Sequence, residues 1–110
     1  MSVFDKEIAA TIAFAKVTGT TGAAIMNRGF ATITRTGPGV YACVREAGGT
    51  GAGLSADEVL AHVTPQGATA AYPTTQDTDS VTTTVRTFNS IGSAADADFT
   101  ITISRPTNHE

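Results

Sequence analysis

Few residues in this chain have side chains that could do chemistry. The sequence has two histidines, His62 and His109, and one cysteine, Cys43. General acid–base catalysis usually needs a histidine or a poised carboxylate in a cleft, and a nucleophile needs a base beside it. No nucleophile motif such as G-x-S-x-G accompanies His62, and His109 stands next to the last residue. We therefore expect a structural or solvent-facing His62 and a chain that is not an enzyme.

Cys43 has no second cysteine with which to pair. It lies in an apolar run, where a free thiol usually behaves as a small buried apolar group. Cys43 and His62 belong to different segments and could meet in space, but a reactive thiolate needs an electropositive, partly open setting. We favour a structural Cys43.

Two acidic pairs could offer oxygen ligands to calcium, Asp77 with Asp79 and Asp96 with Asp98. The stretch after Asp77 lacks the glycine and the distal glutamate of a standard calcium loop. Aspartates also commonly accept hydrogen bonds from their own backbone in turns, so we predict solvated turn acids. The glycine-rich run 47–53 lacks the lysine of a phosphate-binding loop and is predicted to be a flexible loop. No metal and no cofactor are expected.

Composition excludes several classes of partner. Charged residues make up 15% of the 110 residues, apolar residues 41%, and the net charge is −3. No basic stripe could neutralise a run of phosphates, so nucleic acid is an unexpected partner. No apolar run approaches the roughly 20 residues of a membrane span, and Asp5 and Glu7 do not fit the basic start of a signal peptide. We expect a soluble protein that does not bind a membrane.

The clearest structural signal is a hairpin over residues 31–44. Residues 30–35 and 40–45 both alternate, and the turn between them contains Gly37, Pro38 and Gly39. Pro38 presets its own φ, and either glycine can take a positive φ. Every second residue from Val40 to Val44 is apolar, and we expect this set to face the core.

Further strands are predicted by alternation and by turn residues. The expected ranges are 8–18, 23–27, 59–64, 81–88 and 99–104. The first and third are ambiguous, because Phe4, Ile8 and Ile12 also repeat at helical spacing and Ser55 with Glu58 satisfies a capping box. Residues 66–80, which include Pro73, are predicted to be a polar loop. About six strands without crossover helices indicate one all-β domain over residues 1–110, an antiparallel β-sandwich or small barrel.

Three segments carry a resemblance to a known class of protein. They read FATITRTGPGVYACV, VLAHVTPQG and VRTFNSIGSAADADFTITISR, and they lie within residues 29–110. In this order they resemble β-structured modules of bacteriophage virion proteins, such as head decoration proteins and head or tail fibre domains. The matching features are Gly39-Val40-Tyr41 after a turn, Thr64-Pro65 at a strand end, and the turn 92–98 before the last strand.

The resemblance implies a virion subunit that binds a capsid or tail surface, often as a homotrimer, with no catalytic residues. Because the chain lacks a collagen-like or coiled-coil shaft, we favour a head decoration or cement protein with the major capsid protein as its partner. The alternative is a receptor- or glycan-binding fibre or tail module that uses the loops 47–53 and 66–80. Segment 1–18 is a candidate partner contact through Phe4, Ile8 and Ile12, which could equally close the domain's own core.

Overall fold

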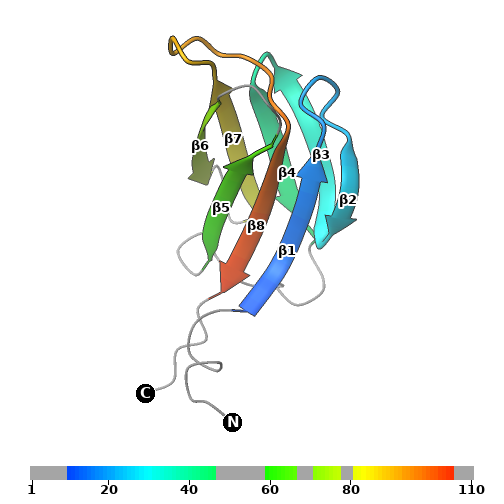
Figure 1. Ribbon diagram of the computed structural model, residues 1–110. Helices are drawn as coiled ribbons and strands as arrows, with labels where there is room; N and C mark the ends of the chain where they lie inside the picture. Colours follow the sequence, from blue (N-terminus) through cyan, green and yellow to red (C-terminus); the bar gives the residue numbers. More distant parts are fainter. Residues whose placement is uncertain (1–9, 47–58, 67–70, 78–80, 106–110) are drawn as a thin grey trace.

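The computed structural model describes residues 10–46, 59–66, 71–77 and 81–105, and these form eight strands without a helix (Figure 1). The strands are β1 (Ala10–Val17), β2 (Ala24–Arg28), β3 (Phe30–Gly37), β4 (Val40–Arg45), β5 (Leu60–Pro65), β6 (Tyr72–Asp77), β7 (Thr82–Phe88) and β8 (Phe99–Arg105). The sequence predicted about six strands, and the described residues contain eight.

The strands form two four-stranded sheets in which all neighbours are antiparallel. One has the order β2-β1-β8-β5 and is named here the β1 sheet; the other has the order β3-β4-β7-β6 and is named the β4 sheet. The sheets pack face to face as two open layers (Figure 1). This confirms the predicted all-β, antiparallel sandwich.

The core lies between the sheets and follows the alternation of the strands. In β8, Phe99, Ile101 and Ile103 are fully buried, as their alternation with threonine and serine predicts. Burying each of these side chains stabilises the fold by about 1.5–3 kcal/mol. From β1, the small side chains of Ala13 and Ala15 point into the same core. The buried apolar residues are Ile12, Ala13, Ala15, Val17, Phe30, Tyr41, Cys43, Val59, Val85, Phe99, Ile101 and Ile103.

The hairpin of β3 and β4 has the predicted position, but its buried face is the opposite of the predicted one. Tyr41 and Cys43 are fully buried and Arg45 is 5% exposed, whereas Val40, Ala42 and Val44 lie half-buried on the outer face. Cross-strand neighbours explain the reversal, because Tyr41 lies opposite Val85 and Cys43 opposite Ile33, both of which pack in the core. The turn is fixed by Gly39, which has φ +67°, while Gly37 stays in β3 without a positive φ.

Strand β6 corrects the prediction of a polar loop over residues 66–80. Residues 72–77 pair with β7, and Pro73 lies opposite Thr87. Proline cannot donate to a ladder, which is why it argues against a strand, but β6 is the edge of the β4 sheet and has β7 as its single neighbour. Because an edge strand pairs on one side only, its backbone N–H groups are needed for one neighbouring strand rather than for two.

The remaining predicted strands are close to the observed ones. Strand β1 lies within the predicted 8–18, and β2 and β5 each differ from their predictions by one residue at either end. The strand interpretation of 59–64 is thus confirmed over the helical alternative. The glycine-rich run 47–53 and the capping pair Ser55 and Glu58 lie outside the described residues.

Candidate functional site

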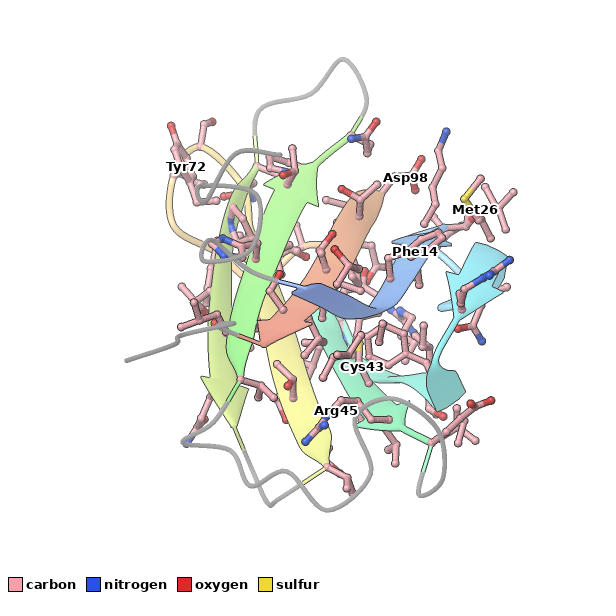
Figure 2. The ribbon with its side chains drawn as sticks, turned by 90° about the horizontal axis from the view of Figure 1, so that it is seen from below. Phe14, Met26, Cys43, Arg45, Tyr72 and Asp98 are labelled. Atoms are coloured by element: carbon pink, nitrogen blue, oxygen red, sulfur yellow. The ribbon has the colours of Figure 1, made fainter. Side chains whose placement is uncertain are left out.

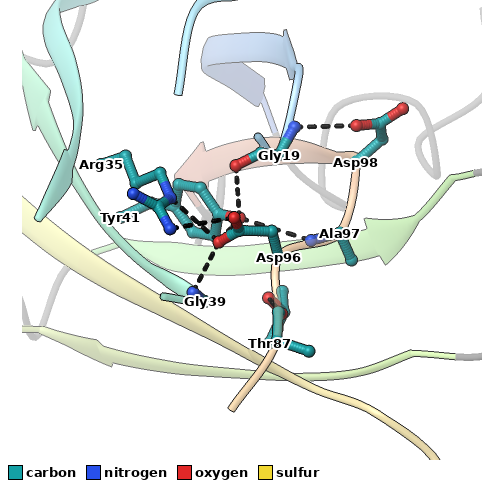
Figure 3. Close-up of polar contacts among 9 residues, drawn as sticks. Gly19, Arg35, Gly39, Tyr41, Thr87, Asp96, Ala97 and Asp98 are labelled. Atoms are coloured by element: carbon teal, nitrogen blue, oxygen red, sulfur yellow. Dashed lines mark hydrogen bonds and ion pairs between the residues drawn. The ribbon is translucent and has the colours of Figure 1, made fainter. Parts of the chain in front are cut away.

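The most elaborate polar cluster centres on the carboxylate of Asp96, in the connection between β7 and β8 (Figure 3). Arg35 on β3 donates from Nε to Oδ1 and pairs through Nη2 with Oδ2, both at 3.0 Å. The backbone N–H of Gly39 donates to Oδ1 at 2.7 Å, and the Tyr41 hydroxyl lies 3.3 Å from the same oxygen. The hydrogen bond from Arg35, followed by that from Gly39, holds the pKa of Asp96 below its ordinary value.

Tyr41 extends this cluster into the core. Its ring packs edge-on against Phe99 with 4.9 Å between centroids, and its hydroxyl donates to the carbonyl of Gly19 at 2.9 Å. The same hydroxyl accepts from the N–H of Ala97 at 3.3 Å. A phenol has one proton to donate, and the shorter contact to Gly19 uses it. Desolvation by burial is the main reason that the pKa of Tyr41 is raised.

A second carboxylate fastens the same connection to the turn between β1 and β2. Asp98 accepts from the N–H of Gly19 at 2.7 Å, and its own carbonyl accepts from the N–H of Gln66 at 2.8 Å. Gly19 lies so close to Ala97 that an added Cβ would stand 2.4 Å from the Ala97 carbonyl carbon. Thr87 on β7 completes the attachment by donating to the Ala95 carbonyl at 2.6 Å.

The chemistry of this cluster is that of a structural clasp. Asp96 already receives hydrogen bonds from Arg35 and Gly39, and a carboxylate kept ionised in this way is a poor general acid. Asp96 and Asp98 were predicted to be solvated turn acids. Asp98 is exposed as predicted and Asp96 is partly buried, and each also accepts from a backbone amide of another segment. They do not converge on one point, and the described residues contain no group of three metal-ligating side chains.

Cys43 and His62 do not meet. Cys43 is fully buried between the sheets, whereas His62 is exposed on β5 and alternates with the inward-facing Ala61 and Val63 (Figure 2). Burial raises the pKa of the Cys43 thiol to about 12, so the thiolate that a nucleophile needs is scarce at neutral pH. The predicted burial of Cys43 and the predicted exposure of His62 to solvent are therefore confirmed. His109 and Asp79 lie outside the described residues.

An apolar groove crosses the outer face of the β1 sheet. It is named here the Phe14–Met26 groove, and its volume is about 440 Å³. Phe14 and Met26 lie beside each other on this face, from β1 and β2 (Figure 2). Lys16 is the one charged residue among those that line it. The lining residues are Thr11, Phe14, Ala15, Lys16, Met26, Thr100, Ile101 and Thr102.

Several large apolar side chains are exposed outside the core. Ile91, in the turn after β7, is 83% exposed, and Ile25 on β2 is 70% exposed. Met26, Leu60 and Tyr72 are each about half exposed. Such side chains, where they gather at a groove, mark surfaces that bind other macromolecules.

The predicted contact residues of the N-terminal segment are only partly described. Ile12 lies at a register shift of β1 and packs in the chain's own core, one of the two roles left open for it. Phe4 and Ile8 lie outside the described residues. Phe14 faces outward and was not predicted as a contact. The register shift between Thr11 and Ala13 turns Ile12 into the core and Phe14 onto the outer face, although the two residues lie two positions apart.

The described part of the chain contains no helix of the length and apolar character that crossing a bilayer requires. No protein-family model, curated protein or solved structure matches the chain. Any functional assignment must therefore be argued from the residues and the geometry given above.

Proposed function

We propose that this chain is a structural subunit of a bacteriophage virion that binds the capsid surface as a decoration or cement protein. The observation that carries the proposal is the contrast between the Asp96–Arg35 pair, which holds the fold together, and the apolar groove on the outer face. Asp96 and Arg35 are paired with each other and hold neighbouring turns in place, while Phe14 and Met26 line an apolar groove on the outer face. Such an arrangement suits a protein that binds a partner better than one that catalyses a reaction.

The clasp around Asp96 supports a binding role. It fixes the connection between β7 and β8 to β3, to the β3–β4 turn and to the β1–β2 turn. A surface that is ordered before binding loses less conformational freedom when the complex forms. A subunit that must sit in many equivalent places on a shell benefits from such a fixed shape.

The named partners of the proposal come from the sequence resemblance. They are the major capsid protein and further copies of this chain, with a homotrimer as the expected oligomer and the virion as the location. The apolar groove lined by Phe14 and the exposed Met26 supports a protein partner, since contiguous exposed apolar surface commonly marks interaction sites.

The test is reconstitution on capsids that lack this protein. We expect the purified chain to bind such capsids saturably, at a fixed ratio to the major capsid protein, as measured by co-sedimentation and by electron microscopy. A variant with Phe14→Asp and Met26→Asp should bind less, and Leu60→Asp, on the same face but outside the groove, is the matched control. Absence of saturable binding by the unmodified chain would contradict the proposal.

A receptor- or glycan-binding role is the second candidate, and Tyr72 is the observation that favours it. This aromatic residue is 56% exposed on the edge strand β6, and Arg86 on the neighbouring β7 donates to Gln76 of β6 at 2.8 Å. An exposed tyrosine offers an apolar ring and a hydroxyl together, a combination that is enriched at binding interfaces. Binding of the chain to a panel of host glycans, lost in Tyr72→Ala, would favour this candidate over capsid decoration.

A further inference from the structure

Two of the four edge strands of the sandwich contain a proline. Strands β5 and β6 are outer strands of different sheets and lie side by side along one flank of the molecule (Figure 1). Pro65 is the last residue of β5, and Pro73 is the second residue of β6. Both strands pair in continuous register with their single neighbours, β5 with β8 and β6 with β7. A regular edge strand offers a row of backbone N–H and C=O groups to which a strand of another chain can add.

The direction of the backbone of Pro73 follows from its neighbour Thr87. Pro73 lies opposite Thr87 on β7. The Thr87 N–H donates to the Gly39 carbonyl at 2.8 Å, and the Thr87 carbonyl accepts from the Ala95 N–H at 3.1 Å, so neither group is directed at β6. In an antiparallel pair, opposite residues either exchange both hydrogen bonds or both point away from each other, in alternation. The pair of Pro73 and Thr87 is of the second kind, and the Pro73 nitrogen faces the open edge.

Pro65 has the same orientation on β5. The N–H of the next residue, Gln66, donates to the Asp98 carbonyl at 2.8 Å, on the side of β8. Pro65 lies opposite Phe99, and its backbone points the other way because the direction alternates along a strand. Each proline therefore stands where an N–H would have pointed out of the sheet. It costs the fold no ladder hydrogen bond and removes a donor that an added strand would need.

The other two edge strands are irregular. A register shift between β1 and β2 leaves Ile25 of β2 without an opposite residue. Two register shifts between β3 and β4 do the same to Ala31 and Thr36 of β3. Extra residues of this kind bend a strand and interrupt the spacing of its donors and acceptors, which is one way in which edge strands are kept from pairing. All four edges of the sandwich thus contain an interruption.

We propose that Pro65 and Pro73 are blocking residues that prevent strands of other chains from adding to β5 and β6. Together with the irregular β2 and β3, they close the edges of both sheets to backbone pairing. The chain then meets its partners through side chains on its sheet faces and turns, and crowded copies do not merge into one continuous sheet. The inference goes beyond the proposed function and does not depend on it.

Moving the proline along β6 tests the inference. Pro73→Thr supplies an outward N–H, and we expect its self-association in sedimentation velocity to be about tenfold or more stronger than that of the native chain. Adding Thr75→Pro should restore the native behaviour, because alternation directs the Thr75 N–H outward as well. Thr74→Pro is the matched control: the Thr74 N–H points to β7, so this change should lower the urea midpoint sharply, whereas Thr75→Pro alone should leave it near the native value.

Amide hydrogen exchange provides a second readout that needs no substitution. In the native chain, the Thr75 amide should exchange about tenfold or more faster than the amides of Thr74 and Gln76, which point to β7. In associated Pro73→Thr, the Thr75 amide should become protected, as a backbone ladder requires. Slow exchange of the Thr75 amide in the native chain, unchanged self-association of Pro73→Thr, or association that Thr75→Pro does not reverse would each overturn the inference. Saturable capsid binding by a chain that fails these tests would leave the proposed function standing.

Discussion

At the scale of single residues, Asp96 shows how one carboxylate can join segments that are distant in sequence. Its partner Arg35 is 61 positions away, and Gly39 is 57 positions away. From the sequence, Asp96 was predicted only to be a turn acid. Local patterns carry no information about Arg35, which reaches Asp96 only in the folded chain. Burial of Cys43 was predicted from its apolar run, whereas the predicted core face of the same strand, with Val40 and Val44, would have pointed it outward.

Replacing Asp96 should lower stability in a manner that depends on pH. Because the pKa of Asp96 is held below its ordinary value of 3.8, its contribution is fully present above that value. The contribution is lost as the pH falls through the lowered folded-state pKa. We expect Asp96→Asn to cost about 2 kcal/mol at neutral pH, since the Gly39 amide and Arg35 lose a charged acceptor.

The measurement for Asp96 is urea unfolding at a series of pH values from neutral down to strong acid. The difference between the native chain and Asp96→Asn should shrink at the acid end of the series. Glu46→Gln, which neutralises an exposed carboxylate, is the control and should match the native chain closely. A pH-independent difference for Asp96→Asn would refute an electrostatic role.

Removing the hydroxyl of Tyr41 should also destabilise the fold. Tyr41→Phe keeps the ring against Phe99 but leaves the Gly19 carbonyl and the Ala97 amide without this partner. We expect a loss of about 1–3 kcal/mol in the free energy of unfolding. Thermal or urea unfolding measures it, and Tyr72→Phe, at an exposed position, is the matched control. Equal stabilities of the two variants would show that the buried hydroxyl contributes nothing.

At the scale of elements, the strands that could be predicted are those with strong alternation of apolar and polar residues. Phe99, Ile101 and Ile103 identify β8 and its buried face. Strand β6 could not be predicted, because Pro73 and its polar neighbours read as a loop until the edge position is known. The buried face of β4 depends on cross-strand partners, which a single strand does not reveal.

Alanine substitutions at Gly39 and Gly37 test the observed turn between β3 and β4. Gly39 has φ +67°, and a Cβ there would stand 2.6 Å from the Thr87 carbonyl oxygen, whereas a Cβ on Gly37 meets nothing within 4 Å. We expect Gly39→Ala to lose about 2 kcal/mol or more of stability, through backbone strain and steric conflict. Gly37→Ala should stay within about 0.5 kcal/mol of the native chain. Similar values for both variants in urea unfolding would contradict the observed turn.

At the scale of the whole molecule, an antiparallel sandwich or small barrel was predictable from strand count and the lack of helices, whereas the Phe14–Met26 groove was not. The Phe14–Met26 groove combines residues of β1, β2 and β8, so it exists only after the sheet has formed. Alternation alone would place Phe14 on the same face as the buried Ile12, and the register shift between Thr11 and Ala13 reverses this.

The rate at which the Cys43 thiol is alkylated measures whether the two sheets stay packed together. It is fully buried between the sheets, and burial raises the pKa of its thiol to about 12. We expect alkylation at neutral pH to be slow in the native protein and to become fast in denaturant, because the reagent reaches the thiol only when the sheets separate. Mass spectrometry follows the reaction. Rapid stoichiometric labelling of the folded chain would place Cys43 outside the core.

The proposal that this sandwich is a capsid-binding subunit is tested most directly by locating it on particles. Virions purified from infected cells would be imaged by electron microscopy, and their protein content would be measured by mass spectrometry. We predict repeated density of the size of this domain on the outer surface of the head, with the groove of each copy buried against a neighbour. Virions that are infectious and complete but lack the chain, or that carry it only at a tail tip, would contradict capsid decoration.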